Sequence, residues 1–205
     1  MTVLAFLFAA LILAVTPGPG LAYVVARTVS GGRSEGLASS LGTAIGGLFH
    51  VGAAALGISV LVAQSAFAFS LVKYVGAAYL VYLGIRTLRQ KQDGFVVQEV
   101  ASAGVSRAFR QGVVVEILNV KTALFFLAFL PQFTTTNSPL GMQLALLGSV
   151  CVVLNTTMDL VAVYATDRLL QSQLGRASGA RVLTRISGFT MLMLGTFLAF
   201  ARRNA

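Results

Sequence analysis

Long uncharged stretches dominate the chain, and each is long enough to form membrane-spanning helix. The residues ahead of Arg27 carry no charged side chain, and neither do residues 36–72 or 122–158. A spanning helix needs about 20 apolar residues to cross a hydrocarbon core of roughly 30 Å. Residues 4–13 are continuously apolar rather than alternating, which favours helices over the strands of a membrane barrel.

The gaps between charged residues predict six spanning helices. The first has no basic leading region, and its apolar stretch exceeds the roughly 7–15 residues of a signal peptide, so we interpret it as a retained span. The sequence therefore predicts an all-α membrane protein. The predicted spans lie near Val3–Val25, Leu37–Ala63, Phe67–Leu88, Gly112–Phe133, Gly141–Thr166 and Val182–Phe200.

Composition supports this prediction. Of the 205 residues, 57% are hydrophobic and only 10% are charged, and the mean hydropathy is +0.85. A soluble domain carries about 25% charged residues, so this chain has too few to cover a globule in water. Its excess of apolar residues equally excludes a disordered chain.

The net charge of +9 lies mainly in alternate loops. The second loop (64–66) and the fourth (134–139) carry no charge, so the positive-inside rule places the odd-numbered loops in the cytoplasm. We assign the charge to this orientation and expect no nucleic-acid partner. Arg202 and Arg203 depart from the pattern and leave the side of the C-terminus open. The basic residues of the odd loops are Arg27, Arg33, Arg89, Lys91, Arg107, Arg110, Arg168, Arg176 and Arg181.

The chain divides into two similar halves. Residues 1–88 and 112–205 each hold three predicted helices, and a charged cytoplasmic linker (89–111) separates them. Residues 73–76 in the third predicted helix resemble residues 185–188 in the sixth. Because each half has an odd number of helices, the second half crosses the membrane in the opposite orientation to the first. We therefore predict two inverted three-helix repeats, an arrangement that places transport sites near the bilayer midplane.

A Pro- and Gly-rich segment interrupts the first span. Pro17 and Pro19 remove two backbone donors, and Gly18 and Gly20 remove side-chain resistance to unwinding. Broken backbone at membrane depth is tolerated where protein or water surrounds it, and its freed amides can hold a carboxylate. We expect Thr16, Pro17, Gly18, Pro19 and Gly20 to bind substrate, the alternative being a hinge without ligand contact.

Ionisable residues in the second, fourth and fifth predicted spans are candidates for function, because each charge near the bilayer centre costs roughly 2.5–3.5 kcal/mol. Asn119, Lys121 and Asp159 are predicted substrate ligands, whereas Glu116, Asp159 and His50 are candidates for proton coupling. We expect Lys121 to pair with Asp159 or Glu116. A purely structural ion pair, an interfacial position for the carboxylates, and a neutral His50 bonded to a neighbouring helix remain alternatives.

The chain offers little for redox or metal chemistry. Its single cysteine, Cys151, permits neither an internal disulfide nor a thiol relay, which argues against a membrane redox enzyme. With His50 as the one histidine, we expect no metal site and no cofactor, and we do not expect an enzyme. Gly42 and Gly46 form a GxxxG pattern that predicts close packing, within the chain or in a homodimer.

The motifs together resemble the LysE/RhtB family of bacterial lysine exporters and homoserine/threonine efflux proteins. This resemblance implies a secondary transporter that exports amino acids or their derivatives across the bacterial cytoplasmic (inner) membrane, usually driven by the proton gradient. The motifs that carry it are Thr16-Pro17-Gly18-Pro19, Gly42/Gly46/His50, 73–84, Phe109-x-x-Gly112, Asn119-Val120-Lys121 and Pro131-Gln132-Phe133.

Two positions depart from that family. Val120 stands where the family usually has proline, so we expect a milder break in the fourth span. Glu116 stands where a neutral polar residue is common, which can shift the charge preference for substrate. A metal-ion exporter and a non-transporting accessory membrane subunit are the alternatives. The expected partners are a small-molecule amino-acid substrate and membrane lipid.

Overall fold

The computed structural model describes residues 3–58, 65–89, 102–135, 138–171 and 196, and the regular structure in these segments is helical throughout. This confirms the predicted all-α class. The predicted sixth span lies almost wholly outside the described residues. The elements are α1 (Val3–Val15), α2 (Pro19–Ala53), the π-helical η1 (Ala54–Ile58), α4 (Ala66–Arg89), α5 (Val105–Ile117), α6 (Val120–Leu124), the π-helical η2 (Phe125–Phe129), the 3-10 helix η3 (Leu130–Phe133) and α7 (Leu140–Gln171).

Several of these helices are long and apolar enough to cross a membrane. By length and composition, Leu140–Arg168 qualifies alone in the described part of the chain, and so does Pro19–Gly57, although this stretch contains a turn at Gly32. Val105–Ile117 and Val120–Phe133, which meet at a bend of 42°, qualify together as one broken span. The fold is therefore compatible with a membrane protein, and the helical segment of the fourth span begins at Val105 rather than at Gly112.

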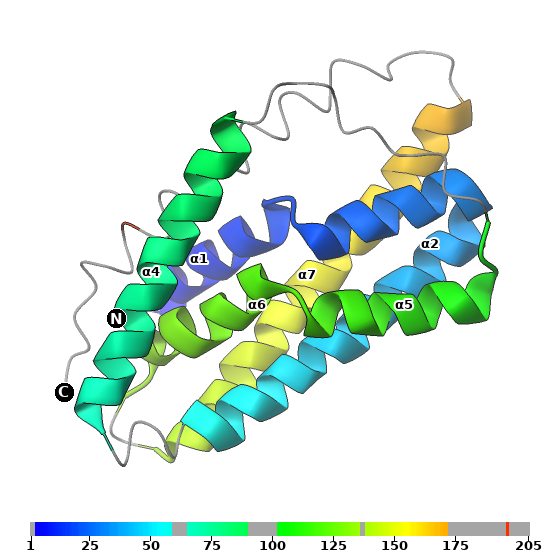
Figure 1. Ribbon diagram of the computed structural model, residues 1–205. Helices are drawn as coiled ribbons and strands as arrows, with labels where there is room; N and C mark the ends of the chain where they lie inside the picture. Colours follow the sequence, from blue (N-terminus) through cyan, green and yellow to red (C-terminus); the bar gives the residue numbers. More distant parts are fainter. Residues whose placement is uncertain (1–2, 59–64, 90–101, 136–137, 172–195, 197–205) are drawn as a thin grey trace.

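Helix α2 reverses direction at a glycine. Gly32 has φ 70° and ψ −168°, a backbone conformation that side chains strongly disfavour, and Figure 1 shows the blue chain turning back there. Helix α2 thus consists of a first limb (19–31) and a second limb (33–53). Arg27 Nη1 lies 3.8 Å from Glu35 Oε2 and so joins the two limbs across the turn.

Glycines bring the second limb of α2 against α5. A Cβ at Gly42 would overlap the carbonyl oxygen of Phe109, and one at Gly46 would lie 2.7 Å from Glu116 Cβ. Gly112 on α5 is equally close, because a Cβ there would lie 2.7 Å from the carbonyl oxygen of Ser39. The predicted glycine packing therefore operates within the chain.

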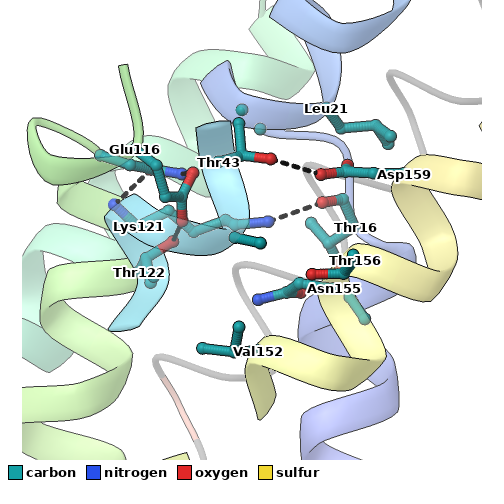
Figure 2. A pocket seen from close by; sticks show the side chains of 16 residues that line it. Thr16, Leu21, Thr43, Glu116, Lys121, Thr122, Val152, Asn155, Thr156 and Asp159 are labelled. Carbon is teal, nitrogen blue, oxygen red and sulfur yellow. Dashed lines mark hydrogen bonds between the residues drawn. The ribbon is translucent and has the colours of Figure 1, made fainter. Parts of the chain in front are cut away.

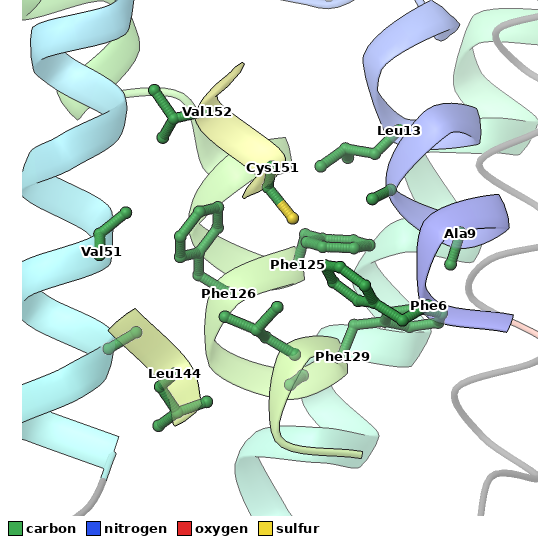
Figure 3. Close-up of a cluster of buried hydrophobic side chains, with 14 of the residues drawn as sticks. Phe6, Ala9, Leu13, Val51, Phe125, Phe126, Phe129, Leu144, Cys151 and Val152 are labelled. Carbon is green, nitrogen blue, oxygen red and sulfur yellow. The ribbon is translucent and has the colours of Figure 1, made fainter. Parts of the chain in front are cut away.

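An aromatic core anchors α1 to the segment that follows α6. The rings of Phe125 and Phe129 stack with their centroids 4.8 Å apart, and the rings of Phe6 and Phe133 meet edge-on at 5.6 Å. Figure 3 shows Phe6, Phe125 and Phe129 together in this core, with Cys151 pointing into the cluster. This core fixes the N-terminal half of one broken span against the C-terminal half of the other.

We predict that Gly42→Ala destabilises the protein by about 1–3 kcal/mol, because the new methyl group overfills the contact with α5. The matched control is Gly52→Ala, whose Cβ would meet nothing within 4 Å. That change should be neutral or stabilising by about 0.5–1 kcal/mol, since alanine favours helix. Thermal unfolding of the purified protein in detergent measures both, and equal effects of the two substitutions would contradict the packing described.

Candidate functional site

The first span is broken where the sequence predicts. Helix α1 ends at Val15 and α2 begins at Pro19, with Gly18 between them in extended backbone geometry (φ −140°, ψ −175°). Thr16 Oγ1 donates to the carbonyl oxygen of Ile12 at 2.6 Å and closes the last turn of α1. The break leaves the carbonyl end of one half-helix and the amide end of another inside the bundle.

The fourth span is also broken, although it lacks the family proline. Helix α5 ends at Ile117 and α6 begins at Val120. Asn119 between them has extended geometry, and its Oδ1 accepts a hydrogen bond from the backbone N–H of Lys121 at 3.1 Å. Asparagine is among the best N-caps, so this side chain starts the new half-helix without help from proline.

Lys121 reaches from the second break to the first. At the end of α1, its Nζ donates to the carbonyl oxygen of Thr16 at 2.7 Å (Figure 2). It also donates to the carbonyl oxygen of Leu13 at 3.1 Å. Gly18 permits this approach, because a Cβ there would lie 3.0 Å from Lys121 Cε. The ammonium therefore satisfies carbonyls that the break has freed, at the negative end of the helix dipole.

The prediction that Lys121 forms an ion pair with Asp159 or Glu116 is wrong. In the described part of the chain, the ion pairs are Arg27–Glu35 and Arg33–Asp167. The reason is that the broken end of α1 supplies two carbonyl acceptors at close range. A sequence that shows only side chains does not reveal these backbone acceptors.

The carboxylate of Glu116 is held at two helix beginnings. Its Oε2 accepts from Asn119 Nδ2 at 3.0 Å, and its Oε1 accepts from Thr122 Oγ1 at 2.6 Å in the first turn of α6. It also faces the first turn of α2, because a Cβ on Gly20 would lie 2.5 Å from Oε2. Negative charge is favoured near helix N-termini, so the breaks stabilise this buried carboxylate.

His50 supports the second break from outside the pocket. Its Nε2 lies 2.8 Å from the carbonyl oxygen of Glu116, and since a carbonyl can only accept, this nitrogen carries the proton. The backbone N–H of Asn119 donates to the same oxygen at 3.0 Å. His50 therefore caps the end of α5 as a residue of a neighbouring helix, while its role in proton coupling stays a prediction.

Asp159 on α7 forms the opposite wall. Its Oδ2 accepts from Thr43 Oγ1 at 2.8 Å, and the side chain is 7% exposed. Asn155 and Thr156 lie about one turn earlier on α7 and face the same space (Figure 2). A second buried carboxylate thus stands across the pocket from the two breaks.

These walls enclose a cavity of about 30 Å³. A buried water needs roughly 10–15 Å³ on this measure, so the cavity holds about two waters and must widen to admit a larger molecule. Its charged groups are two carboxylates and one ammonium. The lining residues are Ala14, Thr16, Gly18, Gly20, Leu21, Thr43, Ala44, Gly47, Glu116, Asn119, Lys121, Thr122, Val152, Asn155, Thr156 and Asp159.

Most of the predicted site residues meet at this cavity, but Pro17, Pro19 and His50 do not line it. Sequence reasoning missed Thr43, Thr122 and the Asn155-Thr156 pair. The pair could have been found from its spacing, because residues about one turn before Asp159 share its helix face. In the part of the chain described, no cluster of three or more His, Cys, Asp or Glu side chains could hold a metal ion.

Two broken apolar helices whose breaks meet at a buried charged pocket define a helical membrane protein with an internal polar site. Discontinuous helices of this kind form the binding sites of many secondary transporters.

Comparison with known proteins agrees with this class. The chain belongs to the family of LysE type translocators, whose sequence pattern matches residues 11–202. It is 30% identical to an uncharacterized membrane protein of Vibrio cholerae, over 97% of each chain. It is 28% identical to a homoserine/homoserine lactone efflux protein of Salmonella typhimurium, over 97% of this chain and 96% of the relative. No solved structure matches the chain.

We predict that Asn119→Ala lowers the free energy of unfolding by about 1 kcal/mol, because α6 loses its N-cap. Asn119→Ser keeps a capping oxygen and should retain most of the stability. Chemical or thermal unfolding in detergent compares the two variants with the wild type. Equal losses in both would show that capping is not what Asn119 contributes.

Proposed function

We propose that the protein is a secondary transporter that exports small amino acids or their derivatives from the cytoplasm. The observation that carries the proposal is the contact of Lys121 Nζ with the carbonyl oxygens of Leu13 and Thr16, which joins two helix breaks at one polar pocket. The Salmonella relative is named an efflux protein for homoserine and homoserine lactone, which supports this direction of transport and this class of substrate.

The pocket offers complementary groups to a zwitterion. The backbone N–H groups of Gly20 and Leu21 lie in the first turn of α2, which leaves them without partners inside the helix. We assign the substrate carboxylate to these amides, with Asn119 beside them. The ammonium group goes to Asp159, or to the carbonyls of α1 that Lys121 occupies in this structure. In the second arrangement, Lys121 acts as an internal substitute for the substrate cation.

Proton coupling follows from competition at one carboxylate. If Asp159 is the acceptor for the substrate ammonium, a proton bound there removes the negative charge that attracts the substrate. A proton and a substrate then exclude one another, which is the requirement for antiport. Glu116 and His50 remain the other candidates, and the hydrogen bond of His50 to the Glu116 carbonyl links both to the second break.

The alternating access that export requires fits two inverted three-helix repeats. Residues 1–88 would form one and 112–205 the other, with 89–111 as the cytoplasmic linker. The facing breaks in α1–α2 and α5–α6 support this, because each falls in the first span of its half. Rocking of one repeat against the other would open the pocket to each side in turn. We place the protein in the bacterial inner membrane with its odd-numbered loops in the cytoplasm.

Export from dipeptide-loaded cells tests the proposal. Bacteria that cleave homoserine-containing dipeptides should accumulate less homoserine inside, and release more, when they express the protein than when they carry empty vector. Lys121→Ala should reduce export to the vector level, because the end of α1 loses its partner. Val120→Ala, which truncates the exposed neighbouring side chain, is the control and should export normally.

Membrane levels of each variant must be matched by immunoblotting. Wild-type export by Lys121→Ala would remove Lys121 from the mechanism. Equal accumulation with and without the wild-type protein, repeated across dipeptides of other small amino acids, would contradict the proposed function itself.

The helix break generates a separate prediction. Pro17→Ala combined with Pro19→Ala should allow α1 and α2 to join as continuous helix and should abolish export, because the freed backbone groups become paired. Pro139→Ala, in the exposed loop before α7, is the matched control. Full export by the double variant in the same assay would show that the break is dispensable.

A further inference from the structure

A second hollow lies outside the pocket, between the first limb of α2 and the N-terminal half of α5. It has a volume of about 780 Å³ and is wide open at the surface. Three arginines line it: Arg27 from α2, and Arg107 and Arg110 from α5. The proposed transport mechanism uses none of them.

The three arginines form a positively charged cluster, with one buried member and two exposed members. Arg27 is 7% exposed and is fixed by hydrogen bonds to Gln111 Oε1 at 2.7 Å and to the hydroxyl oxygen of Tyr23 at 3.2 Å. Arg107 and Arg110 are exposed, and their spacing of three places them on one face of α5. The hollow therefore combines one anchored guanidinium with two that can reach a ligand.

Among the residues that the structure describes, the carboxylate that pairs with this cluster belongs to Glu35 and is largely engaged elsewhere. Glu35 Oε2 lies 3.8 Å from Arg27 Nη1, while Glu35 Oε1 accepts from Ser102 Oγ at 2.5 Å and from the N–H of Gly104 at 2.7 Å. Neither Arg107 nor Arg110 takes part in an ion pair in the described part of the chain, so their side of the hollow is positively charged. An anion is the ligand that complements it.

The hollow changes from polar to apolar along α5. Arg107 and Arg110 lie in the first two turns of α5, and Val114 and Val115 line the hollow one turn further on. Val114 is 54% exposed, as a side chain in contact with acyl chains would be. A ligand that matches both parts carries an anionic head and a hydrocarbon tail.

We propose that this hollow binds an anionic phospholipid from the leaflet that faces the linker. The phosphodiester would accept hydrogen bonds from Arg107 and Arg110, whose guanidinium groups suit phosphate geometry. An acyl chain would lie over Val114 and Val115. Such a lipid would join the first limb of α2 to α5, the two segments that lead into the helix breaks. The site is independent of the transported substrate; the proposed orientation makes the leaflet cytoplasmic.

Native mass spectrometry of the full-length protein, released from detergent with defined lipids, tests the proposal. Wild type should retain phosphatidylglycerol in preference to phosphatidylethanolamine with the same acyl chains. Arg107→Gln combined with Arg110→Gln should weaken this retention roughly 30-fold. Each basic residue contributes about 1 kcal/mol to the binding of anionic lipid, and about 2 kcal/mol corresponds to this factor. Arg89→Gln with Arg168→Gln removes the same charge at the exposed ends of α4 and α7, and should leave retention unchanged.

Two further measurements separate loss of binding from loss of folding, and lipid from free phosphate. Arg107→Lys with Arg110→Lys retains the charge and should retain part of the binding, even if the glutamine pair does not fold. Inorganic phosphate at matched concentration should not raise the thermal unfolding temperature, whereas phosphatidylglycerol should. Absence of a lipid preference in wild type, equal losses in both glutamine pairs, or an equal shift with phosphate would overturn the proposal.

Discussion

The structure depends on one contact, between the Lys121 ammonium and the carbonyl oxygens of Leu13 and Thr16. A helix that stops inside a membrane leaves its last carbonyls without partners, and each unsatisfied group there costs several kcal/mol. A buried lysine alone would be equally unfavourable. Each satisfies the other, so the broken α1 and the buried Lys121 require one another. The contact also fixes where the two broken spans cross.

The same principle governs the other helix ends at the pocket. His50 caps the end of α5 through the Glu116 carbonyl, and the Glu116 carboxylate lies at the beginnings of α6 and α2. Several partners that stabilise these ends are side chains from another segment, as Lys121 is for α1 and His50 for α5. Because such a partner can be replaced by a ligand group of equal charge, the arrangement that stabilises the breaks also prepares a site for a charged solute.

Rigid packing surrounds this exchangeable centre. The edge-on contact between Phe6 and Phe133 holds α1 against the segment after α6, and the glycine contact at Gly42 holds α2 against α5. Close packing transmits displacement rather than absorbing it. Widening of the small cavity therefore requires the half-helices to move as bodies, which is the motion that alternating access needs.

Much of this site could be predicted from sequence, since Pro17 to Gly20 dictate the first break whatever their surroundings. The second break could not be predicted from a proline, because Asn119 starts α6 by capping. Glu116 and Lys121 would lie on different faces of a straight helix, so their convergence depends on that break. The partner of Lys121 cannot be predicted from side-chain types, because it is the backbone at the end of α1. The reversal between the first two predicted spans follows from the charged loop that holds Arg27 and Arg33, but its place at Gly32 does not, because Gly31 and Gly32 are equally able to turn the chain.

Thiol accessibility at the pocket tests the central claim most directly. Cys151 is buried in the aromatic core, and its replacement by serine leaves a background without cysteine. A Thr156→Cys substitution in that background places one thiol on the pocket wall. We expect a membrane-impermeant thiol reagent to modify it in inside-out or right-side-out vesicles, and homoserine to slow the reaction. Absence of modification from either side, while the denatured protein reacts fully, would contradict a solute-accessible pocket at the two helix breaks.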